Sequence, residues 1–469
     1  MDKEKTKGQK LSEEILSQKE SCYKSFGKTV ENELDGYIDG YIGFLNDAKT
    51  EREFVVKSIE LLEKNGFKEY VVGKTYAAGD KVYYNNKKKS LIAAVIGSEP
   101  LENGVNITAA HIDSPRLDLK PNPLYEDGEL GYFKTHYYGG IKKYQWVTIP
   151  LAIHGTIAKK DGTTIELSLG EKDDEPVFYV TDILPHLSYK VQDDRNARTV
   201  IKGEELNVLI GSEPFDDKEV KEPVKLQMMK LLNEKYGITE DDFISAEIEI
   251  VPALKARYIG FDKSLVGSYA HDDRVCAYTS LTALLANKKA PKRTSLCVLA
   301  DKEETGSEGN TGLSSDMLKN FVAFLCASTG ALKETVFVNS KCLSADVNAA
   351  FDPTFPEVHD KRNAAKLNYG PVITKYTGSG GKYGTNDASA EFMAEVRAFL
   401  DKNDIPWQTG ELGKVDEGGG GTVAKYISRF GVNVVDIGVA LLAMHAPYEI
   451  ASRLDIISTY KAFVEFYKI

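Results

Sequence analysis

The chain has 469 residues and a formal charge of −11, from 59 Lys and Arg against 70 Asp and Glu. This length suits two to three domains with a large hydrophobic core. The mild, evenly spread acidity argues against nucleic acid as a partner. No stretch reaches about 18 uninterrupted apolar residues, so we predict that the chain does not span a membrane.

Two further features of the composition indicate where the protein works. The first ten residues are charged and no apolar run follows them, so they are not typical of a signal peptide. The five cysteines are scattered, odd in number and without a Cys-x-x-Cys pair. We expect them to be small buried side chains of a soluble protein in a reducing compartment, which we predict to be the cytoplasm.

The N-terminal part of the chain predicts helices followed by strands. Residues 11–65 have a helical pattern of apolar side chains that stops at Gly66. Residues 82–84 and 91–96 predict a hairpin across a polar turn. Residues 105–110 then predict an apolar strand that runs directly into a polar motif.

That motif is His111-Ile-Asp113, a His and an Asp two residues apart. On an extended chain, residues i and i+2 face the same side, so Asp113 can contact the His111 ring. A carboxylate that fixes the tautomer of an imidazole is the usual partner of a metal-binding histidine. A lone His-x-Asp is more often structural, so the motif is only suggestive by itself.

The composition changes after residue 115. The passage from 121 to 146 is rich in Gly and aromatic residues, and strand-like alternation follows it around a hairpin turn at 160–163. One helix is predicted to stop at Gly237 before a further strand. We therefore predict that an insert, mostly β, interrupts one α/β domain. The predicted boundaries are 1–116 for the first part of the α/β domain, 117–261 for the insert and 262–469 for the second part.

A buried strand predicted at 294–300 leads to two adjacent carboxylates, Glu303 and Glu304, and then to a loop rich in Gly, Ser and Asn. A helix capped by Ser314 or Ser315 should follow that loop. Ligands of open α/β sheets bind outside the carboxyl ends of the strands. Adjacent side chains point different ways as a strand ends. One Glu could therefore bind a cation while the other faces a bound water as a general base.

Other residues of ligand type stand at comparable places in the second half of the chain. Asp272 and Asp273 begin a predicted helix, where two acids also suit the helix dipole. Asp346 comes at the end of an apparent strand. His445 follows shortly after the strand predicted at 433–437.

Four consecutive glycines, Gly418–Gly421, precede a short predicted helix. They could suggest a phosphate-binding loop, but the Gly-Lys-Ser/Thr ending of a P-loop is missing and no clear strand precedes them. A close approach of backbone to backbone is the better interpretation.

Five residues of ligand type thus stand in loops that follow apolar runs: His111, Asp272, Glu304, Asp346 and His445. Two imidazoles and three carboxylates suit zinc, cobalt or manganese. One shared Asp, with one His and one carboxylate on each side, would hold two divalent ions, each with an open position. Such a pair can bridge a water, lower its pKa towards neutrality and clamp a carbonyl or phosphoryl oxygen. Glu303 would then be free to take the proton.

The residues around these positions form five motifs in a fixed order: His111-Ile-Asp113-Ser-Pro, Asp272-Asp273, Glu303-Glu304-Thr-Gly-Ser, Ser344-Ala-Asp346 and Ala443-Met-His445. Together they resemble the aspartyl aminopeptidase family of dinuclear zinc peptidases. The likeness runs from about residue 20 to the C-terminus and includes the insert. It implies an α/β fold, with a mixed central sheet flanked by helices and an inserted β-rich dimerisation domain. It also implies release of an N-terminal residue, acidic or neutral, from peptide substrates.

The resemblance implies a role for each residue of the motifs. It implies five metal ligands: His111 and Asp346 on one ion, Glu304 and His445 on the other, and Asp272 between the two. Asp273 remains open as the alternative bridge. Glu303 would be the general base, and Asp113 would orient His111.

The same resemblance implies an assembly. Dimers would build a tetrahedral dodecamer with an internal chamber. His186, in Leu184-Pro-His-Leu187, matches a histidine that members of the family lend to the active site of a neighbouring subunit. We therefore expect His186 to be a substrate-binding residue.

One departure from the family concerns specificity. Its acid-specific members place a Lys directly after a Gly-Pro-Val-Ile strand, but here Thr374 follows that strand and the lysine is Lys375. On a strand, the offset of one residue turns the ammonium to the opposite face unless a bulge intervenes. Loss of a fixed cation would weaken a preference for N-terminal Asp or Glu. Lys375 is the second substrate-binding candidate.

Two other classes of function can be weighed against an aminopeptidase. A metal-dependent hydrolase of another amide or phosphoester bond would use the same centre. A phosphoesterase would need cations near the metals, and Arg116 and Arg274 are near in sequence. A non-catalytic protein that keeps the fold would be expected to have lost ligands, and none is lost here.

Overall fold

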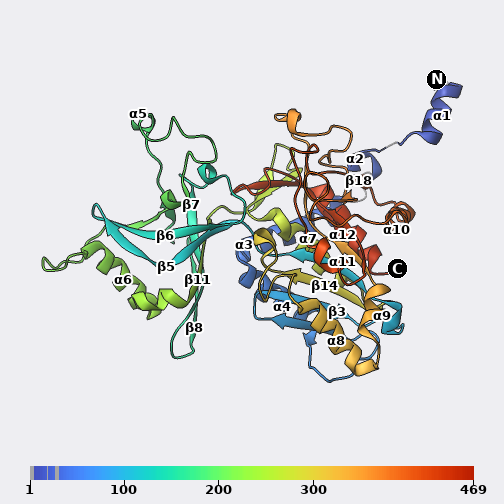
Figure 1. Cartoon of the computed structure of the whole chain (residues 1–469), viewed down its shortest axis with the longest axis horizontal. Coiled ribbons are helices and arrows are strands. Elements are labelled where there is room, and N and C mark those ends of the chain that lie inside the picture. The colour runs from blue at the N-terminus through green and yellow to red at the C-terminus, as the bar shows by residue number, and fades with distance from the viewer. Residues whose placement is uncertain (1–4, 18, 27–30) are drawn as a thin grey trace.

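The structure is a computed structural model and is described for residues 5–17, 19–26 and 31–469. Figure 1 shows a larger part with helices around a sheet and, beside it, a smaller part made mainly of long strands. The larger part is built on a nine-stranded sheet. Its strands, in spatial order, are β1 (Lys68–Glu69), β2 (Lys81–Asn86), β3 (Ser90–Val95), β14 (Ser295–Ala300), β4 (Asn106–His111), β15 (Lys341–Ser344), β19 (Asn433–Gly438), β17 (Val372–Thr374) and β18 (Gln408–Thr409).

The middle of this sheet is parallel. β14, β4, β15 and β19 run side by side in one direction, while β3 and β17 flank them in the antiparallel direction. The carboxyl ends of four neighbouring strands therefore meet at one edge of the sheet. The predicted mixed α/β fold is confirmed, and so is the predicted hairpin, now β2 and β3.

Helices cover both faces of the sheet because side chains alternate along the buried strands. In β3, Leu91 and Ala93 belong to the core on one face, whereas Ile92 and Ala94 belong to the core on the other. The helices on the first face are α3 (Glu31–Asp47), α4 (Glu51–Lys64), α7 (His271–Ala286), α10 (Ala390–Lys402) and α12 (Arg453–Phe466). Those on the second face are α8 (Met317–Thr329), α9 (Lys333–Val338) and α11 (Ala424–Ser428).

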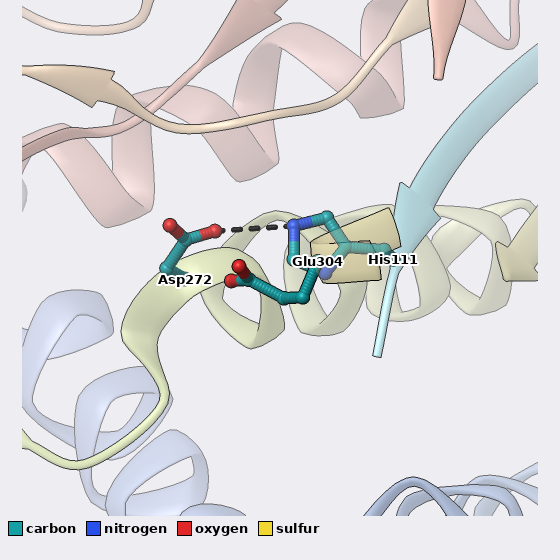
Figure 2. A group of neighbouring side chains, drawn as sticks. All are labelled: His111, Asp272 and Glu304. Atoms are coloured by element: carbon teal, nitrogen blue, oxygen red, sulfur yellow. Dashed lines mark ion pairs between the residues drawn. The ribbon is translucent and has the colours of Figure 1, made fainter. Parts of the chain in front are cut away.

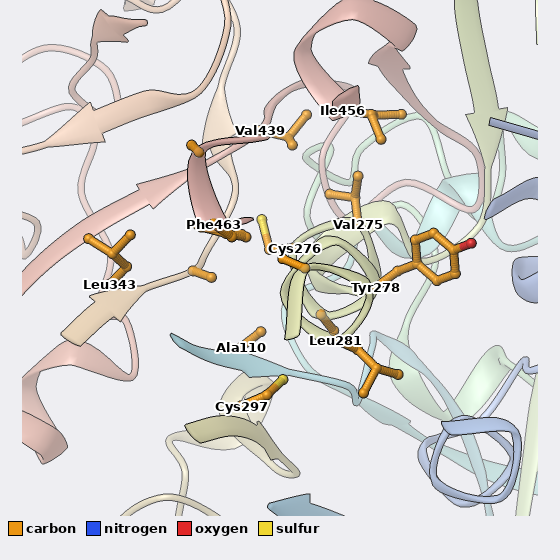
Figure 3. Close-up of a cluster of buried hydrophobic side chains, with 14 of the residues drawn as sticks. Ala110, Val275, Cys276, Tyr278, Leu281, Cys297, Leu343, Val439, Ile456 and Phe463 are labelled. Carbon is orange, nitrogen blue, oxygen red and sulfur yellow. The ribbon is translucent and has the colours of Figure 1, made fainter. Parts of the chain in front are cut away.

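The first core is centred on α7. Figure 3 shows Cys276 on this helix above Ala110 and Cys297 of the sheet, with Leu281 of the same helix to their right. Cys276 and Cys297 are fully buried, as are the other three cysteines to within a few per cent, and none is paired. The expectation of small, unpaired, buried cysteine side chains is confirmed.

The helical pattern predicted for residues 11–65 is divided into separate helices. They are α1 (Lys7–Ile15), α2 (Cys22–Ser25), α3 and α4, and residues 18 and 27–30 of the predicted range lie outside the described residues. Thr50 separates α3 from α4, because its side chain accepts a hydrogen bond from the Glu53 backbone and Glu53 returns one in a capping box. Within the described ranges, no helix is long and apolar enough to cross a membrane.

A seven-stranded antiparallel sheet forms the smaller part. Its strands, in spatial order, are β11 (Ala246–Pro252), β5 (Arg116–Asp127), β6 (Leu130–Tyr138), β10 (Val208–Gly211), β9 (Phe178–Val180), β7 (Pro150–Ala158) and β8 (Thr164–Leu169). A further pairing of β11 with β7 closes the sheet into a ring. The helices of this part are α5 (Pro185–Ser188) and α6 (Pro223–Tyr236), and α6 stops at the left-handed Gly237 as predicted. All these strands fall between residues 116 and 252, and the domain boundaries remain a prediction.

A third sheet connects the two parts. Its strands, in spatial order, are β12 (Arg257–Ile259), β13 (Leu265–Ser268), β21 (Glu449–Ser452), β20 (Ala440–Leu442) and β16 (Asn348–Ala349). The antiparallel register of β13 and β21 places Ser268 opposite Glu449. The segment that precedes α7 therefore lies beside the segment that follows β20.

Two local predictions have different outcomes. The cap of α8 was predicted wrongly, because Asp316 is the N-cap residue and Ser315 Oγ only accepts a bond of 3.3 Å from the Met317 backbone. The close backbone approach at Gly418–Gly421 is confirmed. A Cβ on Gly418 would lie 1.9 Å from the Leu412 carbonyl oxygen, and one on Gly419 would lie 2.0 Å from that of Gly378.

The buried side chain of His154 joins the two parts, and its protonation makes the stability of the protein depend on pH. His154 in β7 lies 2.7 Å from Glu53 in α4 through Nδ1 and 3.0 Å from Glu171 through Nε2. Burial opposes protonation, but the two carboxylates outweigh it and raise the pKa of His154 to about 9. In the unfolded chain the pKa of a histidine is about 6.5. The stabilisation is therefore complete below about pH 6.5 and is lost as the pH rises through about 9.

We expect the melting temperature of the wild type to exceed that of His154→Gln at pH 6, and the difference to shrink steadily up to pH 9.5. The upper limit of the slope is about 1.4 kcal/mol per pH unit. Scanning fluorimetry of both proteins at equal concentration measures the difference. A gap that is constant over this range would show that His154 does not titrate.

Candidate metal centre

The predicted ligands come together at the carboxyl edge of the parallel strands. His111 is the last residue of β4, and Asp346 lies two residues after the end of β15. Glu304 lies in the single helical turn Glu303–Thr305 that follows β14. His445 follows β20, and Asp272 stands at the start of α7. Because β14, β4 and β15 are adjacent and parallel, their ends bring three of these residues to one place.

Asp272 lies between the two histidines. Its Oδ1 is 3.1 Å from Nε2 of His111, and its Oδ2 is 3.1 Å from Nε2 of His445. Figure 2 shows the Asp272 carboxylate facing the His111 ring, with Glu304 beside them. Asp272 thus offers one oxygen to each histidine, which is the arrangement that a bridging carboxylate needs.

Each of the remaining two carboxylates lies close to one of the histidines. Glu304 Oε1 is 3.5 Å from His445 Nε2, and Asp346 Oδ1 is 4.0 Å from His111 Nε2. Two sets of three residues could each hold a metal ion, because the ligand atoms within each set lie within 4.8 Å of one another. The two sets share His111. The sets are His111, Asp272 and Glu304, and His111, Asp273 and Asp346.

Asp273 also reaches this centre, as a member of the second of these sets. Its Oδ2 accepts a hydrogen bond of 3.3 Å from the His111 backbone, and its side chain is fully buried. Asp272 differs from Asp273 in that it has one oxygen 3.1 Å from Nε2 of each histidine.

Both histidines present Nε2 to the centre because Nδ1 is engaged elsewhere. Nδ1 of His111 lies 3.0 Å from the Asp113 carbonyl oxygen, and Nδ1 of His445 lies 2.8 Å from the Gly140 carbonyl oxygen. Donation from Nδ1 to a carbonyl leaves the lone pair on Nε2, as a metal ligand requires. Gly140 lies just after β6, so the smaller part of the molecule fixes one of these rings.

The centre fits a cation on a second ground. Asp272 Oδ1 and Glu304 Oε1 are buried and accept no hydrogen bond from any of the residues described. A buried carboxylate oxygen without a donor is costly unless a cation compensates it. The donor set of two imidazoles and several carboxylates matches zinc, cobalt or manganese.

The pKa values express the same crowding of charge. Burial, and then the neighbouring Asp272 carboxylate, hold the pKa of Glu304 well above its usual value. Burial and the carboxylate of Asp273 do the same to the pKa of Asp346. Burial opposes the charge of His445, but Asp272 and Glu304 outweigh it and raise its pKa to about 10. Divalent cations would relieve this mutual repulsion between carboxylates.

Asp113 fixes the loop that carries the two glutamates. Its Oδ1 accepts a bond of 3.0 Å from the Glu303 backbone, and its Oδ2 accepts one of 3.2 Å from the Glu304 backbone. Tyr138 also donates to Oδ2, at 2.7 Å. The expected contact with His111 is present, since Oδ1 lies 3.4 Å from Nδ1. Asp113 therefore positions His111, Glu303 and Glu304. The sequence had indicated only its contact with His111.

A cavity of about 290 Å³ opens beside the centre. Glu303 lines it, together with His111, Asp272, Asp346 and His445. Burial is the main cause that raises the pKa of Glu303 to about 7. Other lining residues come from two glycine-rich segments, 376–382 and 411–422, and the glycines of both segments pack closely.

The structure does not bring the two substrate-binding candidates to this cavity. Lys375 does not line it and forms an ion pair with Asp387, whereas the preceding Thr374 does line it. The offset of one residue thus has the effect expected on a strand. His186 is exposed in α5, which Figure 1 shows at the top of the smaller part.

Two lysines that the sequence had not indicated do line the cavity. Lys382 lies 3.0 Å from Asp387 and 3.7 Å above the Tyr376 ring. Lys414 forms no ion pair with a carboxylate of the described residues. Both stand in glycine-rich segments without periodicity, so only their spatial placement could have identified them.

The comparisons with known proteins agree with this centre. Residues 44–467 match the family model for aminopeptidase I zinc metalloproteases (M18). A probable M18 family aminopeptidase 1 of Clostridium acetobutylicum is 52% identical over 97% of this chain and 100% of its own length. One of Thermotoga maritima is 47% identical over 92% of this chain and 95% of its own length. The chain belongs to the M18 family of zinc aminopeptidases.

Solved structures support the same assignment. The crystal structure of aminopeptidase I from C. acetobutylicum has a TM-score of 0.91, at 50% identity over 96% of this chain and 99% of that one. The T. maritima M18 aminopeptidase structure has the same TM-score, at 44% identity and the same coverage. The S. cerevisiae mApe1 dodecamer has a TM-score of 0.76 at 23% identity, over 93% of this chain and 97% of that one, and shows the shared fold.

Replacement of each neighbouring aspartate distinguishes the two candidate bridges. We expect Asp272→Asn to lose metal, because one oxygen faces each histidine. We expect Asp273→Asn to retain it, because the Asp273 carboxylate bonds to the His111 backbone. Metal content after dialysis, measured by inductively coupled plasma mass spectrometry, provides the answer. The opposite pattern would assign the bridge to Asp273.

Proposed function

We propose that this zinc aminopeptidase hydrolyses the N-terminal peptide bond with two metal ions. His111 and Asp346 would hold one, Glu304 and His445 the other, and Asp272 both. The observation that carries the proposal is the position of Asp272, with one oxygen towards each imidazole at 3.1 Å. When bound, such a pair of ions activates a water and polarises the substrate carbonyl. Zinc is the expected metal, with cobalt or manganese as alternatives.

Glu303 is the proposed general base. Its carboxylate lines the cavity, while the backbone bond to Asp113 fixes its main chain. The carboxylate would take a proton from the attacking water and deliver it to the nitrogen of the departing peptide. A general base works best with a pKa near the working pH, and burial places the pKa of Glu303 at about 7. Asp113 would act through His111 and the glutamate loop, as a residue that positions them.

The positions of Arg116 and Arg274, the two arginines near the motifs, disfavour the alternative that the protein is a phosphoesterase. Arg116 is buried against Glu249 at 3.2 Å and Asp118 at 2.8 Å, and its guanidinium lies over the Tyr138 ring. Arg274 is buried and donates to the carbonyl oxygens of residues 48 and 112. Neither lines the cavity, so neither can clamp a phosphate beside the centre.

We further propose that the chain assembles from dimers into a homododecamer. The support is the family resemblance, together with the dodecamer formed by the similar yeast protein. The insert, residues 117–261, would serve as the dimerisation domain, between the two parts of the catalytic domain, 1–116 and 262–469. The exposed position of His186 in the insert suits contact with the site of another subunit.

The N-terminal residue of the substrate is proposed to be acidic or neutral. Lys375 is paired with Asp387 outside the cavity, so it is poorly placed to bind an acidic side chain. Lys414 lines the cavity and has no carboxylate partner among the described residues. If the enzyme selects acidic residues, Lys414 is the better placed cation.

Glu303→Gln tests the general base. The amide keeps the shape of the side chain but cannot take the proton, so we expect the release of aminoacyl chromogens to fall by about 10²- to 10⁴-fold. Metal content should be unchanged. Glu308→Gln is the matched control, because Glu308 is an exposed residue of the same loop that does not line the cavity. Unaltered activity in Glu303→Gln would exclude Glu303 as the base.

Lys414→Met and Lys375→Met test the selecting cation. The substrates are chromogenic derivatives of Asp, Glu, Leu, Lys and Ala, each assayed with a chelator control. If wild type prefers Asp and Glu, we expect Lys414→Met to lower their release relative to Leu by about tenfold, the size of a lost charge-assisted bond. Lys375→Met should leave the ratio unaltered. The reverse result would return the role to Lys375.

A further inference from the structure

One buried carboxylate outside the five motifs contacts two segments of the centre. Glu449 is the first residue of β21, and its side chain is 1% exposed. Its Oε2 accepts a hydrogen bond of 3.0 Å from the Asp272 backbone. Its Oε1 accepts one of 2.6 Å from the His445 backbone. A single side chain therefore ties together two segments that lie 173 residues apart, as the numbers 272 and 445 show.

The segments that Glu449 joins are held in unusual backbone conformations. Ala270, Ala443 and His445 have φ values of +63°, +57° and +65°, in the left-handed region that side chains with a Cβ rarely adopt. Such conformations persist only where the surrounding structure fixes them. The bonds from Glu449 supply that constraint on both sides, because each of its oxygens accepts from the backbone of one proposed ligand.

The sheet places Glu449 at this crossing point. β21 pairs on one side with β13, which leads to Asp272, and on the other with β20, which leads to His445. Both oxygens of Glu449 are engaged by backbone N–H groups, so they do not point into the centre as ligands. This arrangement parallels Asp113, whose two oxygens accept from the backbones of Glu303 and Glu304.

We infer that Glu449 is a positioning residue that sets the spacing between Asp272 and His445. It thereby prepares the site of the metal ion that Asp272 and His445 would bind together with Glu304. The inference rests on the proposed function, since it takes these two residues as ligands. Partners of this kind that lie behind the ligands typically contribute about 10- to 100-fold to metal affinity or activity. Because Glu449 touches neither substrate nor metal, its effect should appear first in metal binding.

The test compares Glu449→Gln with a matched variant, Asp455→Asn. Asp455 is also a fully buried carboxylate that accepts two backbone bonds, both of 2.7 Å, from Asn368 and Gly370. It does not line the cavity. Both changes convert a carboxylate to an amide, which leaves one backbone N–H facing an NH₂ group. We therefore expect both to lower the melting temperature, and only Glu449→Gln to alter metal binding.

The main measurement is zinc affinity of the full-length protein, by competition with a chromogenic chelator. We expect Glu449→Gln to bind the weaker of two zinc ions about 10- to 100-fold less tightly, and Asp455→Asn to bind both as the wild type does. The absorption spectrum of the cobalt-loaded protein gives a second readout, since a displaced ligand changes it. Glu449→Asp, which keeps the charge but is too short to reach both N–H groups, should lie between wild type and Glu449→Gln. It also serves if Glu449→Gln does not fold.

Several outcomes would overturn the inference. They are wild-type affinity in Glu449→Gln or in Glu449→Asp, an equal loss of affinity in Asp455→Asn, and a wild-type chain that binds no metal. A wild type that binds two ions but releases no N-terminal residue would instead refute the proposed function. In that case the affinities of the variants would still decide the role of Glu449.

Discussion

The architecture of the centre depends on holding several carboxylates together in a place from which water is largely excluded. Asp272, Glu304 and Asp346 gather around two imidazoles, and two of the buried carboxylate oxygens have no hydrogen-bond donor among the residues described. Like charges so close repel, and burial deprives them of solvation. A fold can keep them there only if rigid elements fix each segment and if cations compensate the charge.

The rigid elements are the parallel strands β14, β4 and β15 and the helix α7, all anchored in the same hydrophobic core. Loops of different origin then have to be held in register at the edge of the sheet. Two buried carboxylates act there, because Asp113 binds the backbone of the glutamate loop and Glu449 binds those of Asp272 and His445. The acidic residues thus form two layers. Asp272, Glu304 and Asp346 are the proposed ligands, and Asp113 and Glu449 bind the backbone of the segments that carry ligands.

Residues that stand in local sequence motifs could be predicted from the sequence, whereas residues that only the fold brings to the centre could not. His111, Asp113, Glu303 and Glu304 stand in motifs next to apolar runs, so local pattern and family resemblance find them. The mixed sheet and the helical stop at Gly237 were predicted for the same reason. Glu449 and Lys414 were missed because neither stands in a recognisable motif, and only the folded chain brings Glu449 to the Asp272 backbone and Lys414 to the cavity. The cap of α8 was assigned to Ser314 or Ser315 because serine is a preferred N-cap residue, whereas Asp316 is the N-cap residue in the structure. Lys375 shows the converse, since simple strand alternation explains why its ammonium does not reach the cavity.

The contact between Gly140 and His445 changes how the proposed insert should be regarded. An insertion between two parts of a domain is commonly treated as a module that evolution added and that an engineer can remove. Here the Gly140 carbonyl fixes the ring of His445, and Tyr138, at the end of β6, donates to Asp113. The smaller part therefore contributes contacts directly to the metal centre. A chain without this part would lack the groups that contact the ring of His445 and the carboxylate of Asp113.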